Sequence, residues 1–279
     1  MSTLRNYVPI QAPTIENPPP DSSYTYHEHL PSPPLTPYVA CYWTLNYQAS
    51  LLQQPLHRIL PDGCVDIIFN LKAPAASTSG FIAGLMSSYE AMRLTQDQSL
   101  FGIRFFAESV RPFIHYPASD FREGPVFLEE AWGLNVNRLN EEMVTALDSA
   151  HRMDLVERFL MGVLGQNNVR SEPLLEHGMQ YLYAAKGRIT VRALAEKLNY
   201  SERNIRRIFQ KELGVSPKVM AEIIRFQYLL KELHQARLTR FPDIAAQYGY
   251  YDQPHFINSF RRLYGMSPKQ ALSDRSWNS

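Results

Sequence analysis

Two stretches of the chain decide its fold: VRALAEKLNYSERNIRRIFQKELGVSPKVM (Val191–Met220) and FPDIAAQYGYYDQPHFINSFRRLYGMSPKQAL (Phe241–Leu272). They are two copies of one unit, because Leu194-Ala195 reappears as Ile244-Ala245 and the later Gly-x-Ser-Pro also reappears. The offset between the copies is 50 before the turn and 51 after it, so the second copy holds one extra residue in its turn. A repeat of this length predicts a duplicated supersecondary unit.

Each copy has the pattern of a helix-turn-helix. The apolar residues of the first helix recur at helical spacing, at Val191, Leu194, Ala195 and Leu198. Ser201 is then an N-cap for the second helix, and Gly214 is a left-handed C-cap. In the second copy Asp252 and Gly265 take the same two roles. The first unit is predicted at residues 191–213 and the second at 241–264.

The outer faces of the two second helices carry side chains suited to DNA. Arginine pairs with guanine, Asn or Gln pairs with adenine, and basic side chains contact phosphates. In the first unit these residues are Arg203, Asn204, Arg206, Arg207, Gln210 and Lys211. In the second unit they are Gln253, His255, Asn258, Arg261 and Arg262. A solvated helix face is the alternative for one basic helix, but two such faces in duplicated units favour double-stranded DNA as the partner.

The segment between the two units predicts a single long helix from Pro217 to about Gln235, with its apolar residues at helical spacing. Such a helix is about 30 Å long, and one turn of duplex DNA is ~34 Å. We therefore expect the two second helices to enter successive major grooves on one face of the duplex.

These residues carry a family resemblance. The second copy follows I-A-x-x-x-G-Y-x-D-x-x-H-F-x-x-x-F-R-R-x-x-G-x-S-P from Ile244 to Pro268. Residues 189–272 thus resemble the C-terminal DNA-binding domain of the AraC/XylS family of bacterial transcription regulators. By that resemblance, the base-contacting positions are Arg203, Arg206 and Arg207 in the first unit and Gln253, His255 and Asn258 in the second. The chain departs from the family at Pro254, usually a small polar residue, and at Asn258, often an arginine.

Charge divides the chain into two halves. Residues 172–279 contain 17 Lys and Arg against 10 Asp and Glu, whereas residues 1–171 contain 11 against 17. A basic DNA-binding half joined to an acidic half of another role fits this asymmetry. The only cysteines are Cys41 and Cys64, which argues against a disulfide scaffold, a cysteine-rich zinc site and the zinc-dependent DNA-repair relatives of the family. Neither a long apolar span nor a signal-peptide pattern is present, so a cytoplasmic protein with no membrane partner is expected.

Residues 1–37 contain nine prolines from Pro9 to Pro37 and are predicted to form an extended arm with little internal structure. His27-Glu28-His29 lies in this segment and resembles an H-x-H metal pair. Because prolines follow directly and no strand pattern precedes the pair, we predict no metal and no cofactor there.

Residues 38–124 are predicted as a β-rich sensor domain. Val39–Tyr47, Val65–Leu71 and Leu100–Phe106 are predicted strands rich in β-formers, and Pro61-Asp62-Gly63 is a predicted turn. Short strands without long helices between them indicate a barrel or sandwich. The family resemblance implies a cupin-like β-domain here, and HRILPDGCVDIIFNL (His57–Leu71) resembles an uncharacterised N-terminal subgroup. The overall fold class is therefore α+β, a β-barrel or sandwich followed by helices and then an all-α domain.

A pocket for a small-molecule effector is expected on the inner faces of these strands. Its candidate residues are Trp43, His57, Arg58, Asp66, Phe69, Arg104 and Phe106. Core packing is the alternative for the aromatic residues. Arg104 lies in an apolar strand and is either paired, for example with Asp66, or directed at an acidic ligand. A buried inert thiol is the prediction for Cys64.

Residues 125–170 are predicted to be helical, with one apolar stripe from Val136 to Ala150 and a second helix from about Met153. They cap the β-domain or, as the resemblance implies, pair two subunits into a homodimer. Gly165–Arg170 is the expected linker, and the DNA-binding domain spans residues 171–279. The favoured function is an effector-responsive transcription regulator that contacts RNA polymerase if it is an activator. The alternative is an enzyme or metal-binding β-domain targeted to DNA, but no triad, metal cluster or phosphate loop is visible, so we predict no enzyme.

Overall fold

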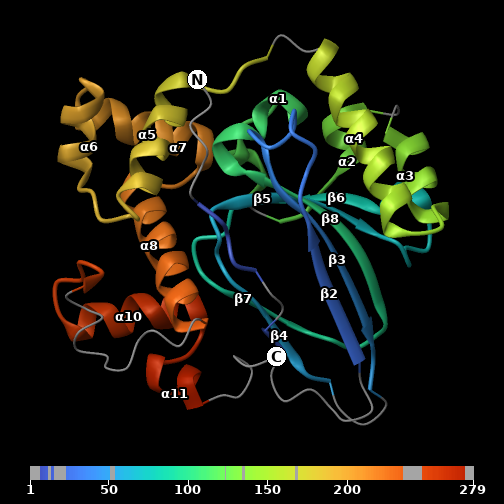
Figure 1. Ribbon diagram of the computed structural model, residues 1–279, viewed down its shortest axis with the longest axis horizontal. Coiled ribbons are helices and arrows are strands. Elements are labelled where there is room, and N and C mark those ends of the chain that lie inside the picture. Colours follow the sequence, from blue (N-terminus) through green and yellow to red (C-terminus); the bar gives the residue numbers. More distant parts are fainter. Residues whose placement is uncertain are drawn as a thin grey trace.

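The computed structural model describes residues 7–11, 14–15, 23–50, 54–122, 124–133, 136–166, 169–234 and 247–273. A β-rich N-terminal part and an all-α C-terminal part lie side by side (Figure 1). This arrangement confirms the predicted α+β class, in which the strands precede the two helix-turn-helix units. Among the residues that the structure describes, every helix is too short or too polar to cross a lipid bilayer.

The β-domain is built from two antiparallel sheets. The six-stranded sheet has the order β2-β3-β8-β5-β6-β9, and the three-stranded sheet has the order β1-β4-β7. The strands are β1 (Thr14–Ile15), β2 (Ser23–His29), β3 (Val39–Gln48), β4 (Leu56–Ile59), β5 (Cys64–Asn70), β6 (Gly80–Ala83), β7 (Glu90–Arg93), β8 (Gln98–Phe106) and β9 (Val126–Phe127). Alternate residues of β5 are buried, and the residues between them are partly exposed, so this strand has one face on the core and one face on a cavity.

The prediction of an arm with little internal structure is wrong for residues 23–29. These residues form β2, which pairs with β3 along its whole length from Ser23 opposite Gln48 to His29 opposite Tyr42. The sequence SYTYHEH has β-forming residues between flanking prolines, and the prolines adjoin the strand without interrupting its ladder. The residues of β3 that pair with β2 lie about twenty residues downstream, so the local proline content does not predict this pairing.

A glycine in β8 places the indole of Trp43. A Cβ atom on Gly102 would lie 2.0 Å from Trp43 Cε2, so only glycine leaves room for the ring against the strand. Trp43 pairs with Gly102 in the register of β3 and β8. The absence of a side chain on one strand therefore positions the aromatic side chain of its neighbour.

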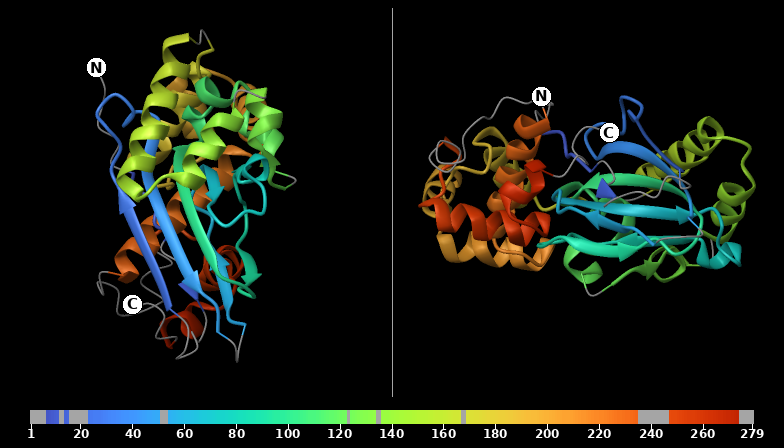
Figure 2. Two further views of the ribbon diagram at one scale, coloured as in Figure 1. Left: turned by 90° about the vertical axis from the view of Figure 1, so that its right-hand side faces the viewer. Right: turned by 90° about the horizontal axis from the view of Figure 1, so that it is seen from below.

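Helices lie between the later strands of the β-domain and after its last strand, β9. They are η1 (Ala76–Thr78), η2 (Ala107–Ser109), α1 (Arg111–Ile114), η3 (Ala118–Phe121), α2 (Leu128–Trp132), α3 (Val136–Thr145) and α4 (Ser149–Gln166). Helix α3 packs on η1 and β5, and α4 packs on α1 and α3. Figures 1 and 2 show α3 and α4 on the side of the β-domain opposite to the C-terminal helices.

The C-terminal part contains α5 (Pro173–Ala184), α6 (Val191–Leu198), α7 (Glu202–Leu213), α8 (Pro217–His234), α10 (Gln253–Tyr264) and α11 (Pro268–Ser273). The predicted caps are present, because Ser201 Oγ accepts from Asn204 N at 3.3 Å and Asp252 Oδ1 accepts from His255 N at 2.7 Å. Gly214 and Gly265 end α7 and α10 with φ of 68° and 93°, in the left-handed region. The first helix predicted for the second unit, from Phe241, and the predicted end of the connecting helix at Gln235 lie outside the described residues.

Candidate nucleic-acid interface and adjoining cavity

Helix α7 of the first unit presents its arginines to solvent. Arg203, Arg206 and Arg207 are exposed, whereas Ile205 and Phe209 on the other face are buried. Arg206 pairs with Glu202 one turn earlier at 2.6 Å, and Arg207 donates to Asn204 Oδ1 at 2.9 Å. Such exposed pairs along one helix contribute only a few tenths of a kcal/mol. The guanidinium groups are therefore accessible to a nucleic acid.

The C-terminal end of α7 faces the β-domain. Gln210 Nε2 donates to Gly214 O at 3.1 Å, and Lys211 lies 3.5 Å from the buried carboxylate of Glu212. Glu212 also pairs with Arg111 of α1. Gln210 and Lys211, near the end of α7, are thus exposed but contact other groups of the chain. Arg203, Arg206 and Arg207, nearer its beginning, are more accessible to a partner.

Helix α10 of the second unit presents fewer arginines to solvent than α7 does. Gln253 and Asn258 are exposed, and His255 is half-buried. His255 Nδ1 accepts from Tyr251 N at 3.3 Å, so this ring nitrogen is engaged by the backbone that precedes the helix. Pro254 occupies the first turn, where the absence of an amide proton costs no helical hydrogen bond. Arg261 is exposed.

Arg262 differs from the other predicted DNA contacts. Its Nη1 donates to Ser87 O at 2.6 Å, and its Nη2 pairs with Glu222 of α8 at 2.5 Å. Its backbone oxygen accepts from Tyr89 N at 3.1 Å. In this structure Arg262 connects the second unit to the β-domain, which the resemblance to the family motif did not indicate.

Helix α8 holds the two units at a fixed separation. Its 18 residues span about 27 Å, and α7 and α10 lie toward its two ends (Figure 1). From α8, Arg225 donates to Gly187 O at 2.8 Å, just before the first unit, and to Gly249 O at 3.0 Å, in the turn of the second. The predicted rigid spacer between the units is therefore reinforced by one side chain that contacts both.

A cavity of about 1000 Å³ lies in the β-domain between the two sheets. Five of the predicted effector residues line it: Trp43, His57, Arg58, Asp66 and Arg104. The prediction is wrong for Phe69 and Phe106, which are buried and do not line the cavity. Phe69 is on the core face of β5, one residue out of phase with Asp66, Ile68 and Asn70. Phe106 packs instead on Tyr183 of α5, with ring centroids 6.5 Å apart.

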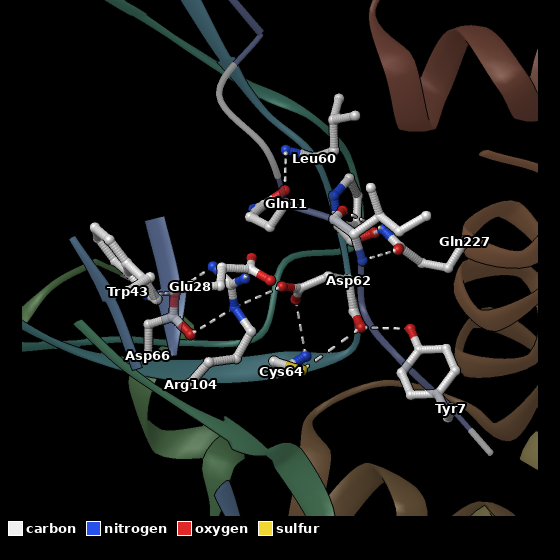
Figure 3. A network of polar contacts seen from close by, with 12 residues as sticks. Tyr7, Gln11, Glu28, Trp43, Leu60, Asp62, Cys64, Asp66, Arg104 and Gln227 are labelled. Atoms are coloured by element: carbon white, nitrogen blue, oxygen red, sulfur yellow. Dashed lines mark hydrogen bonds and ion pairs between the residues drawn. The ribbon is translucent and has the colours of Figure 1, made fainter. Parts of the chain in front are cut away.

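Arg104 is paired with carboxylates of this chain, which is the first of the two alternatives predicted for it. Its Nε and Nη2 contact Asp62 and Asp66 at 3.1 Å each, and its Nη1 lies 3.4 Å from Glu28 (Figure 3). Trp43 Nε1 also donates to Asp66 at 3.1 Å. Burial raises the pKa of Asp62 to about 6, because desolvation and the nearby Asp66 outweigh the attraction of Arg104.

Two further side chains on the cavity wall are uncharged at neutral pH. Burial lowers the pKa of His57 to about 4, so the imidazole is neutral. Burial and the nearby Asp62 raise the pKa of Cys64 well above its usual value, which keeps the thiol protonated. His27 and His29 lie on β2, and no group of three or more His, Cys, Asp or Glu suited to a metal ion occurs within the described ranges.

The cavity wall also contacts both helix-turn-helix units. Met86, Ser87 and Ser88 line the cavity, and they belong to the segment Gly84–Tyr89, which we call the bridging segment. Ser87 accepts from Arg262 of the second unit and, through Oγ at 3.4 Å, from Arg122. Arg122 lines the cavity and donates to Gly214 O, at the end of α7. No local sequence signal indicates these contacts, because the partners are 92 and 175 residues apart.

The N-terminal segment crosses the junction between the domains. Tyr7 stacks on Tyr183 of α5 with centroids 4.5 Å apart, and its hydroxyl donates to Asp62 O at 2.6 Å. Gln227 of α8 donates to Ile10 O at 3.2 Å and accepts from Ile10 N at 2.7 Å (Figure 3). Sequence reasoning treated this stretch as part of the arm and missed its role in joining the two domains.

Comparison with known proteins agrees with the two-part division. Residues 194–274 match a family described as a helix-turn-helix domain, and residues 27–126 match a domain of unknown function, DUF6597. The C-terminal domain therefore carries a helix-turn-helix domain, as the sequence predicted. An uncharacterised HTH-type transcriptional regulator of Haemophilus influenzae is 36% identical over 83 residues. That match covers 29% of this chain and 26% of the relative, so the two are alike over about a quarter of the relative's length.

Solved structures of ToxT from Vibrio cholerae are also similar. An apo ToxT variant has a TM-score of 0.42 at 12% identity over 92% of this chain and 98% of that chain. ToxT with a bound unsaturated fatty acid has a TM-score of 0.40 at 14% identity over 92% and 97% of the two chains.

Proposed function

We propose that this protein is a transcription regulator that binds specific sequences of double-stranded DNA through both helix-turn-helix units. The observation that carries the proposal is the exposed row Arg203, Arg206 and Arg207 on α7, within an AraC-type domain. Guanidinium groups at one- and three-residue spacing on a recognition helix suit guanine edges and phosphates. The spacing set by α8 supports contacts in successive major grooves, because about 27 Å plus the width of the flanking helices approaches one duplex turn of ~34 Å.

The cavity in the β-domain is the proposed site of a small-molecule effector. Its volume of about 1000 Å³ is at the upper end of the range for ligand pockets. The bridging segment supports a route to the DNA-binding domain, because Ser87 borders the cavity and also contacts Arg262 of the second unit. A ligand that displaces this segment changes the attachment of α10, and through Arg122 that of α7.

The further partners follow from the same proposal. Helices α3 and α4 lie on the side of the β-domain away from the DNA-binding domain. Met161 on α4 and Leu147 just before it are 43% and 93% exposed, which supports a homodimer formed by α3 and α4. RNA polymerase is the expected partner if the regulator is an activator, and the cytoplasm is the expected location of a protein that binds bacterial DNA.

Selection of genomic DNA fragments with the purified full chain tests the DNA-binding function. We expect a defined motif to be enriched, with an affinity that falls steeply as salt increases because Lys and Arg displace counterions from phosphates. Arg206→Ala should weaken binding, whereas Arg93→Ala, at an exposed arginine on β7, should not. Failure to enrich any motif, or equal effects of the two substitutions, would reject the function.

Hydrogen exchange tests the coupling without knowledge of the effector. If the cavity and DNA are linked, DNA binding must alter the exchange of the bridging segment, because coupling between two sites is reciprocal. We expect Arg262→Ala to reduce that change by removing the side-chain contact with Ser87. Unchanged exchange of Gly84–Tyr89 in the wild-type complex would show that the cavity does not communicate with the DNA site.

A further inference from the structure

Each recognition helix is preceded by an exposed tyrosine. Tyr200 is 51% exposed and Tyr251 is 93% exposed. Each stands directly before the N-cap of its helix, Ser201 in the first unit and Asp252 in the second. The two positions are equivalent in the repeat, being 51 residues apart like the caps themselves. The same large aromatic side chain is thus directed to solvent at the same place twice.

The backbone at both tyrosines is held in place while the side chains remain outside. Tyr200 N donates to Ala195 O at 3.0 Å, and Tyr251 N donates to His255 Nδ1 at 3.3 Å. The neighbouring Tyr250 is buried, at 5% exposure, so the second unit places one tyrosine in its core and the next one outward. A single exposed aromatic residue needs no explanation, but its repetition at equivalent sites of two units does.

We propose that Tyr200 and Tyr251 each donate a hydrogen bond from the phenolic hydroxyl to a phosphate oxygen bordering the groove that its helix enters. This inference rests on the proposed DNA-binding function. The N-terminal residues of a recognition helix contact base edges, so the residue before its N-cap lies next to the sugar-phosphate backbone. Tyrosine hydroxyls are among the groups that fix the register of a protein on the duplex through phosphates. The ring gives the hydroxyl its reach without adding charge.

The second unit depends more on this contact than the first. At the beginning of α7 the first unit carries Arg203, and the equivalent position in α10 is Pro254, which offers neither charge nor a donor. Arg262, near the other end of α10, is bound to Ser87 and Glu222. Removal of the hydroxyl from Tyr251 is therefore expected to weaken binding more than its removal from Tyr200.

Affinity measurements with Tyr200→Phe and Tyr251→Phe in the full chain test the inference, on the DNA motif selected by the wild type. We expect each substitution to weaken binding by roughly three- to tenfold, the effect of one hydrogen bond, with the larger loss for Tyr251→Phe. The salt dependence should stay as in the wild type, because a phenol displaces no counterion. Tyr116→Phe, at a tyrosine 46% exposed on the β-domain, is the matched control and should bind normally.

Chemically modified DNA identifies the contacted group. A methylphosphonate at the proposed phosphate should weaken binding of the wild type and add no further loss to Tyr251→Phe. Normal binding by both tyrosine variants, or an equal loss in Tyr116→Phe, overturns the inference while leaving the DNA-binding function intact. A wild-type protein that selects no DNA motif rejects that function itself, and the inference with it.

Discussion

The two helix-turn-helix units have the same frame and different surfaces. Both recognition helices begin at a capped residue, end at a left-handed glycine and bury a phenylalanine at the same position, Phe209 in α7 and Phe260 in α10. The outer positions differ: Arg203, Arg206 and Arg207 are matched by Pro254, Ile257 and Asn258. The two units thus share the packing and the helix ends, while α7 presents arginines at positions where α10 carries uncharged side chains.

The units also differ in how the β-domain holds them. The end of α7 is held by residues 111–122, through Arg111 to Glu212 and Ser119 Oγ to Lys211 O at 2.8 Å. The end of α10 is held by the bridging segment, through Ser87 and Tyr89, and Arg58 of the cavity wall lies over the ring of Tyr264 at 5.7 Å. Occupation of the cavity is therefore expected to act on the second unit through Ser87 and Arg58, and on the first through Arg122, which lines the cavity and donates to Gly214 O.

The largest expected effects are on stability, and they test whether the cores of the two helix-turn-helix units are equivalent. Phe209→Ala and Phe260→Ala each remove a ring that is 1% exposed, and each should lower the free energy of unfolding by about 3–5 kcal/mol. Urea unfolding of the full chain provides the measurement. If the two losses in the free energy of unfolding differ by more than Phe→Ala substitutions in well-packed cores usually differ, the two cores are not packed alike.

Substitution of the terminal glycines separates backbone strain from contact with the β-domain. Gly214→Ala and Gly265→Ala each place an alanine at positive φ, and the new Cβ would lie 2.4 Å from Arg122 Cδ or 2.8 Å from the Tyr89 ring. Gly249→Ala has φ of 68° and meets only Arg188 Cγ at 3.9 Å, an ordinary contact, so it reports the strain alone, about 1–2 kcal/mol. We expect both helix-end variants to be less stable than Gly249→Ala. Equal stability of all three would show that the contacts at the helix ends are loose.

A base-contacting pair tests the difference in surface chemistry. Arg207→Ala should reduce affinity by about 1–3 kcal/mol and relax specificity at one base pair. Asn258→Ala, at the equivalent position of the second unit, should cost about 1 kcal/mol because it removes an uncharged partner. Binding to a library of single-base variants of the selected motif measures both. A larger loss for Asn258→Ala would reverse the proposed ranking of the two units.

The smallest expected effect concerns the wall that holds the second unit. The pKa of His57 is lowered from 6.5 to about 4 in the folded protein, so the unfolded chain binds a proton first as the pH falls. Its contribution to stability is present above pH 6.5 and is lost, by about 1 kcal/mol for each pH unit, as the pH falls toward 4. The wild type should therefore lose more stability than His57→Phe over this range in urea unfolding at a series of pH values. Asp62, whose raised pKa acts in the opposite direction, is present in both proteins and cancels. If the stability of the two proteins changes equally with pH, water reaches the imidazole of His57 in the folded protein.

The fold of the DNA-binding domain could be predicted from the sequence because its determinants are local. Caps such as Ser201 and Asp252, the left-handed glycines and the helical spacing of the apolar residues act within a few turns of chain, and the structure has each of them where the pattern indicates. The cavity could be predicted in part, since strand alternation places Asp66 and Arg104 on one face. The prediction failed for Phe69, because a run of β-forming residues does not show which alternate residues of the strand face the core and which face the cavity.

Local pattern by itself determined that this chain has two helix-turn-helix units with capped, basic recognition helices and a β-rich partner domain. Tertiary structure alone decided that residues 23–29 form a strand, that Arg104 is bound by carboxylates from three segments, and that Arg262 contacts Ser87. The physical reason is sequence separation. A cap or a stripe is stabilised by neighbours along the chain, whereas the contact between Arg262 and Ser87 joins groups 175 residues apart, which meet only after both domains have packed.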